Sequence, residues 1–114
     1  MSKAKDRYEF VAVLTREIPT LAPFRVVELA MQLMRCAASA DRLSVAHCNY
    51  METEEYERKI TAVRKRVAKL LVDVPGVTAL QVGGDPRGFC LKLSLPSGAY
   101  NSWGGKESGF GVPC

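Results

Sequence analysis

Apolar and polar residues follow two different spacings along this chain, and the change from one spacing to the other predicts the fold. From residue 6 to residue 74 the apolar positions recur every three or four residues, as in amphipathic helices. In residues 89–95 apolar and polar residues instead alternate, which is typical of a strand with one buried face. The pattern predicts an α+β domain, with about three N-terminal helices followed by a small antiparallel sheet of two or three strands.

Prolines and capping residues set the expected boundaries of the helices. Pro19 ends the first helix, and Pro23 fits the first turn of the second. Thr53 is the expected N-cap of the third helix, and Pro75-Gly76 is its expected stop. The predicted helices therefore span residues 6–18, 24–47 and 54–74.

The second helix has the strongest apolar signal. One line of side chains repeats at helical steps: Val26, Leu29, Leu33, Cys36, Ala40, Leu43 and His47. A second line widens the apolar arc: Phe24, Val27, Met31, Met34, Ala38 and Val45. The third helix has one such line: Tyr56, Ile60, Val63, Val67, Leu70 and Val74. We expect the two helices to form an antiparallel hairpin, and the wide arc to pack on a further neighbour or to form a homodimer through residues 24–47.

The last third of the chain contains the strand and turn signals. The predicted strands span residues 77–82, 89–95 and 99–103. Turn residues separate them at Asp85-Pro86-Arg87-Gly88 and at Leu95-Pro96-Ser97-Gly98. The Gly-rich tail, residues 104–114, is expected to be irregular.

Composition and charge fit one globular domain over residues 1–114, with 47% apolar and 25% charged residues. A net charge of +4 permits an acidic partner such as nucleic acid without requiring one. No apolar run approaches the roughly 20 residues of a membrane span, and the charged N-terminus lacks the features of a secretory signal. Four scattered cysteines with no CxxC pair suggest free thiols. These observations predict a cytoplasmic protein that does not contact membranes.

No motif predicts catalysis, a cofactor or a metal. Cys36, His47 and Cys48 are close in sequence, but on one helix Cys36 and His47 would lie roughly 16 Å apart, too far for one zinc ion. The chain also lacks a P-loop, an HExxH motif and a nucleophile elbow. We therefore expect a protein that is not an enzyme.

Basic residues on the third helix suggest a possible nucleic-acid interface. Arg58, Lys65 and Lys69 share one face, flanked by Arg64 and Arg66. Such a stripe could contact phosphates, with Arg58, Lys65, Arg66 and Lys69 as the candidate contacts. The alternative, favoured by the sequence, is a solvated outer face whose charge is balanced by the glutamates in the first turn.

The GDPRG turn and the last strand form the second candidate surface. Arg87, beside Asp85, could bind an anion or an acidic partner, and Asn101 and Trp103 would share a face of the strand. With Tyr100 they could form a flat recognition surface, and Arg87 with the Gly-rich strand ends could instead hold a nucleotide phosphate. The alternative is that GDPRG has only a turn role and that Trp103 covers the sheet.

Two stretches of the chain resemble small, mostly uncharacterised proteins of bacteriophages and prophages. They are LTREIPTLAPFRVVELAMQLMRCAASADRLSVAHCN and GGDPRGFCLKLSLPSGAYNSWGG, the second followed by GFGVP. The resemblance implies a phage accessory protein and transfers no catalytic residue. Small phage proteins of this kind often bind a host component, so it implies an anti-CRISPR or other anti-defence inhibitor whose partner is a bacterial defence protein or complex.

Overall fold

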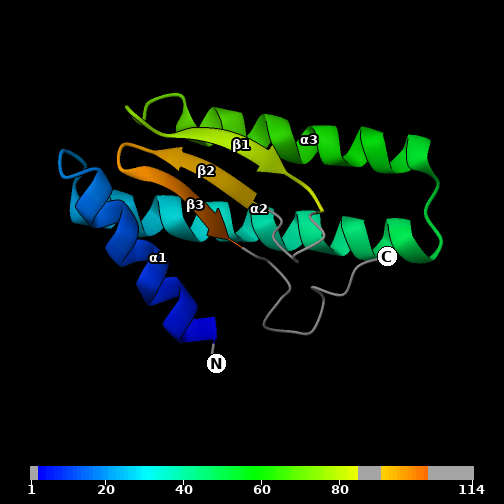
Figure 1. The fold of residues 1–114 in the computed structure, drawn as a ribbon, viewed down its shortest axis with the longest axis horizontal. Helices are drawn as coiled ribbons and strands as arrows, with labels where there is room; N and C mark the ends of the chain where they lie inside the picture. Colours follow the sequence, from blue (N-terminus) through cyan, green and yellow to red (C-terminus); the bar gives the residue numbers. More distant parts are fainter. Residues whose placement is uncertain (1–2, 85–90, 103–114) are drawn as a thin grey trace.

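The computed structural model describes residues 3–84 and 91–102, which form three helices followed by three strands. In chain order these elements are α1 (Lys3–Glu17), α2 (Pro23–Asn49), α3 (Thr53–Leu71), β1 (Thr78–Val82), β2 (Leu91–Leu95) and β3 (Gly98–Ser102) (Figure 1). The α+β prediction is therefore confirmed. The predicted strand ends at Phe89, Cys90 and Trp103, and the tail 104–114, lie outside the described residues.

Helices α2 and α3 form the predicted antiparallel hairpin and run side by side for most of their length (Figure 1). The predicted apolar line of α3 is buried from Tyr56 to Val67. At the end of the helix the buried residue is Leu71, whereas Leu70 is only half-buried, so the prediction was one position off there.

The ends of α3 also differ from the prediction. Glu52 occupies the N-cap position without a side-chain cap hydrogen bond, and Thr53 is already the first helical residue. At the other end the helix stops at Leu71, and the Val74 N–H donates to the Leu71 carbonyl at 3.0 Å in a following turn. Pro75 explains the early stop, because its ring disfavours helical geometry at Val74.

The two apolar lines of α2 have different environments. The first line is buried from Val26 to Ala40. The second is not: Phe24 is 71% exposed, Val27 43% and Met31 41%, while the later members of the line are half-buried. The wide arc of α2 therefore has a covered face and an open face.

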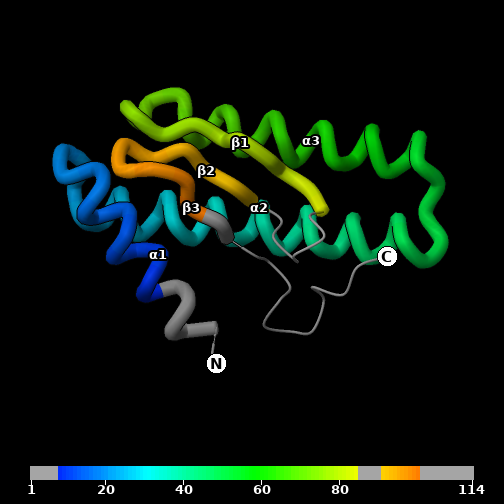
Figure 2. Tube along the Cα trace, viewed as in Figure 1, coloured from blue at the N-terminus to red at the C-terminus, as the bar shows by residue number. Residues whose placement is uncertain are grey.

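The strands form an antiparallel meander in the order β1-β2-β3 (Figure 2). The alternation predicted for β2 is confirmed, since Leu91, Leu93 and Leu95 are all buried. These leucines form one core with the buried residues of α2 and α3, so the sheet covers the helical hairpin on one side (Figure 1). The register of β1 and β2 shifts between Ala79 and Gln81, which leaves a bulge at the exposed Leu80.

Helix α1 is held to both the hairpin and the sheet. The rings of Phe10 in α1 and Tyr100 in β3 stack with centroids 5.3 Å apart and planes 2° apart. At the end of α1, Glu17 accepts hydrogen bonds from Ser97, one from its N–H at 3.1 Å and one from its hydroxyl. Ser97 lies in the turn between β2 and β3, so one carboxylate fixes the turn to the helix.

The cysteines depart from the expectation of free thiols. Cys36 is free and buried in the core. Cys48, near the end of α2, is disulfide-bonded, and its partner is not among the described residues. Disulfides are typical of oxidising compartments, so the cysteines do not support the expectation of a cytoplasmic protein with free thiols.

Burial should make the Cys36 thiol unreactive. Burial raises its pKa above the ordinary 9.0, and the positive charge of Arg66 lowers it by a smaller amount. We expect Cys36 to resist alkylation in the native protein and to react fully in denaturant, as read by peptide mass spectrometry without reductant. Alkylation at equal rates in both states would contradict this.

The raised pKa also predicts a pH dependence of stability. The fold favours the protonated thiol, so this contribution is complete below pH 9.0 and is lost as the pH rises through the higher pKa of the folded state. The free energy of unfolding should therefore fall less steeply above pH 9.0 in Cys36→Ala than in the unmodified chain.

Candidate functional site

At one end of the sheet lie the described residues that flank most of the predicted contact residues in the sequence. The register pairs Val82 with Leu91 and Leu91 with Ser102, so these three residues lie in a row at that end. The segment with Asp85 and Arg87 begins just after Gly84 and returns at Leu91, and Trp103 follows Ser102. Asp85, Arg87 and Trp103 themselves lie outside the described residues, and with them the proposed phosphate cradle.

A row of three polar positions crosses the sheet next to this end. Asn101 pairs with Lys92, and Lys92 pairs with Gln81 on the other side. The Gln81 side-chain amide donates to the carbonyl oxygens of Gly83 and Gly84, at 3.4 and 3.2 Å. Gln81 therefore fixes the backbone from which the GDPRG segment starts.

Tyr100, another predicted contact residue, has a different environment from this row. It pairs with the buried Leu93, and its half-buried ring stacks on Phe10. The ring is thus part of the packing between β3 and α1.

The chain leaves β1 in close contact with the helical hairpin. Gly83 has a φ of +127°, and a Cβ at this position would lie 2.9 Å from the Tyr56 hydroxyl. A Cβ on Gly84 would lie 2.8 Å from the Ser44 hydroxyl. Gly83 is therefore favoured by its backbone conformation and by this close contact, and Gly84 by the close contact alone.

The α2 residues beneath this exit point are polar. Asp41 is only 3% exposed, and Ser44 follows it by three positions, about one turn along α2. No pattern in the sequence distinguished Asp41, although an acidic residue on a buried helix face is an unusual feature. The structure thus adds Ser44 to the site, with the buried Asp41 about one turn away on α2.

His47 lies on the same part of α2 and packs between two residues of α3. Its ring stacks on Tyr56 with centroids 4.4 Å apart, and its Nε2 lies 3.2 Å from the Thr53 hydroxyl. Within residues 3–84 and 91–102, no group of three or more His, Cys, Asp or Glu side chains is arranged to hold a metal ion.

The basic residues of α3 are exposed, and among the described residues only two of them form ion pairs. Lys59 pairs with Glu55 at 3.0 Å, and Arg64 lies 3.9 Å from Glu57. Arg64 also donates from Nε to the Val82 carbonyl at 3.2 Å, which links α3 to β1. The other four basic residues form no ion pair with any described residue: Arg58, Lys65, Arg66 and Lys69.

Comparison of the chain with known protein families, curated proteins and solved structures gives no match. None of the helices in the described residues combines the length and hydrophobicity that a membrane span requires.

The close contact at Gly83 makes a sharp prediction about stability. Gly83→Ala should lower the free energy of unfolding by about 1–3 kcal/mol through backbone strain, with a further loss from the contact with the Tyr56 hydroxyl. Gly98→Ala is the matched control, because Gly98 has a φ of +140° but no atom within 4 Å of the added Cβ.

Chemical denaturation of the two variants, alone and with Tyr56→Phe, separates strain from contact. Tyr56→Phe should recover part of the loss at Gly83 and none of the loss at Gly98. Equal losses in both variants, unchanged by Tyr56→Phe, would contradict the close approach of Gly83 to Tyr56.

Proposed function

We propose that this chain is a phage-encoded inhibitor that binds a bacterial defence protein or complex, as an anti-CRISPR or related anti-defence protein, without catalysing a reaction. The observation in its favour is that Val82, Leu91 and Ser102, which flank the predicted contact residues in the sequence, lie in one row at one end of the sheet. The chain enters and leaves that end at Gly84, Leu91 and Ser102, which brackets Asp85 and Arg87 and leads into Trp103. The resemblance to phage proteins supplies the class of partner.

The anchoring of this end of the sheet suits a recognition surface. Gln81 and Arg64 both bond backbone carbonyls there, and the two glycines pack directly on Tyr56 and Ser44. A surface whose supporting backbone is already ordered loses less conformational entropy on binding. A target could therefore contact Arg87, Asn101 and Trp103 without first ordering the scaffold beneath them.

The host cytoplasm is the proposed place of action, and the Cys48 disulfide bears on the experiment. A reducing cytoplasm would favour the thiol form of Cys48. Binding should therefore be measured with and without reductant.

The test is affinity capture from bacterial lysate followed by measurement with the purified target. Arg87→Glu, Asn101→Ala and Trp103→Ala should each weaken binding by roughly tenfold or more, because a few central residues dominate most interfaces. Arg16→Glu is the matched control for charge, since Arg16 is exposed on α1. Binding that resists all three changes, or capture of no protein, would count against the proposal.

A second function is favoured by the charges on α3. Four exposed basic residues lack ion pairs among the described residues, whereas Glu55 and Glu57 pair with Lys59 and Arg64. Unpaired cations on one helix are suited to nucleic-acid phosphates. We propose the face formed by Arg58, Lys65, Arg66 and Lys69 as a nucleic-acid interface.

A gel shift with duplex and single-stranded DNA at low salt tests this second function. The Lys65→Glu/Lys69→Glu variant should lose binding. If the unmodified chain makes four phosphate contacts, a tenfold rise in salt concentration should lower its affinity about 10³–10⁴-fold. Lys59→Glu/Arg64→Glu, with the same change of charge on the same helix, should weaken binding much less. Equal effects of the two pairs would show that only net charge matters.

A further inference from the structure

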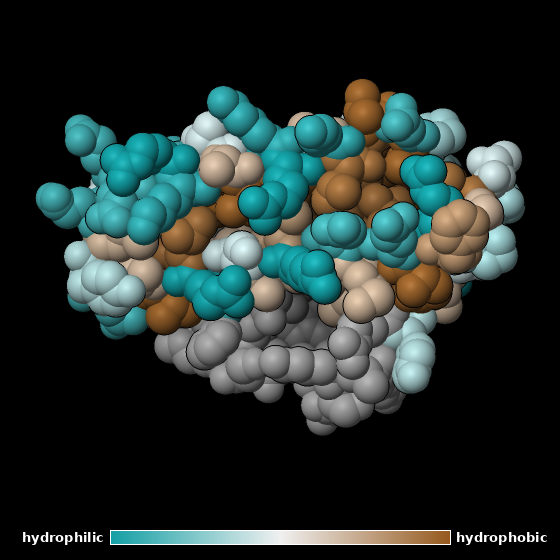
Figure 3. All heavy atoms as spheres, turned by 180° about the vertical axis from the view of Figure 1, so that it is seen from behind, coloured by the Kyte–Doolittle hydropathy of each residue, from teal (hydrophilic) through white to brown (hydrophobic). Residues whose placement is uncertain are grey.

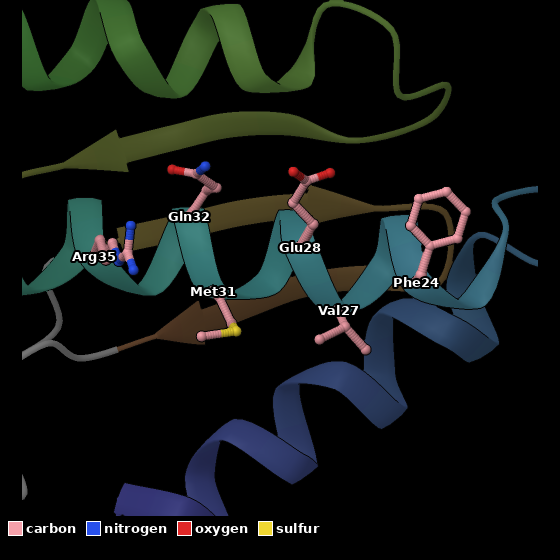
Figure 4. A pocket seen from close by; sticks show the side chains of 6 residues that line it. All are labelled: Phe24, Val27, Glu28, Met31, Gln32 and Arg35. Carbon is pink, nitrogen blue, oxygen red and sulfur yellow. The ribbon is translucent and has the colours of Figure 1, made fainter.

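The open face of α2 bears an apolar groove of about 400 Å³. It is lined by Phe24, Val27, Glu28, Met31, Gln32 and Arg35 (Figure 4). From behind, hydrophobic surface is visible over the N-terminal half of α2 and the adjoining part of α3 (Figure 3). In Figure 4 α2 lies in front of the strands, so the groove opens on the side opposite the sheet.

The charges in the groove have a symmetric arrangement. Glu28 and Arg35 are seven residues apart, which is about 10 Å along the helix and only about 20° around it. Met31 and Gln32 lie midway between them. Neither Glu28 nor Arg35 has an ion pair with any residue in the described part of the chain.

We propose that this groove binds the same groove of a second copy of the chain, with the two α2 helices antiparallel. A twofold axis near Met31 and Gln32 would bring Glu28 of each copy opposite Arg35 of the other, forming two identical ion pairs on one flank. The apolar side chains of Val27 and Met31 would pack beside them. An interface related by a twofold axis must be self-complementary in this way.

The sizes of the side chains agree with this arrangement. The same axis places the exposed ring of Phe24 opposite Ala38 and Ser39 of the second copy, where side chains are small. A large ring facing small residues permits close packing of two helices. The dimer would therefore pair opposite charges and also large with small side chains along the same helix face.

The self-complementary charges favour a second copy over other occupants. A lipid surface would be expected to meet a uniformly basic rim, and Glu28 would oppose it. An unrelated protein needs no symmetric placement of Glu28 and Arg35. This inference is independent of the proposed function, since no residue of the groove belongs to the sheet end.

Sedimentation velocity over a concentration series tests the dimer, with circular dichroism as the check on folding. The unmodified chain should dimerise. Glu28→Arg and Arg35→Glu should each raise the dissociation constant more than tenfold, because each change creates two pairs of like charges across the axis. The combined Glu28→Arg/Arg35→Glu variant should recover the dimer, since it exchanges the signs.

The controls separate this interface from other outcomes. Met31→Asp should give a folded monomer, and Glu54→Arg, an exposed change on α3, should leave the dimer intact. A monomer at every concentration would overturn the proposal, as would a dimer that ignores both single reversals. Failure of the combined variant to recover the dimer would exclude the antiparallel pairing, and binding of the monomer to anionic vesicles through Met31 would assign the groove to lipid.

Discussion

The apolar face of the sheet must be covered, and the hairpin of α2 and α3 covers it. Leu91, Leu93 and Leu95 are all buried on this face, in the same core as the hairpin. Fully burying a leucine is worth about 1.5–3 kcal/mol, so three in one short strand strongly favour a single arrangement. This contact fixes which end of the sheet lies over Ser44 and Tyr56 and which face of α2 remains open.

The sequence predicted this contact because both partners have strict periodicity. Alternation identified Leu91, Leu93 and Leu95, and steps of three and four identified the line from Val26 to Ala40. The spacing of apolar residues in α2 does not show which of its two apolar lines will pack against the sheet and α3. The exposure of Phe24 could therefore not be predicted. Leu71 is buried in place of Leu70 because of where α3 ends. Tertiary packing and Pro75 together determine that end, so periodicity alone could not predict it.

The candidate site was less predictable than the fold, because it depends on strands and helices that meet only in three dimensions. The GDPRG segment and the last strand drew attention through their residue types, but only the register shows that Val82 before that segment, Leu91 after it and Ser102 of β3 lie in one row at one end of the sheet. Ser44 belongs to that end of the sheet because Gly84 approaches it closely. The ion pair between Arg64 and Glu57 depends in the same way on tertiary structure, because Arg64 also donates to the Val82 carbonyl of β1.

The sheet and the groove on α2 lie on opposite sides of α2, and this placement has a consequence for binding (Figure 4). The groove on α2 faces away from the sheet, so two chains joined through it would leave both sheets on the outside (Figures 1 and 4). Each dimer would then present two identical sheet ends. If the target is itself a multi-subunit complex with repeated sites, the second contact becomes intramolecular, and the overall affinity can exceed that of one contact by 10²–10⁴-fold, provided that the spacing of the sites matches. Dimerisation through α2 would thus strengthen inhibition without adding any contact to the recognition surface.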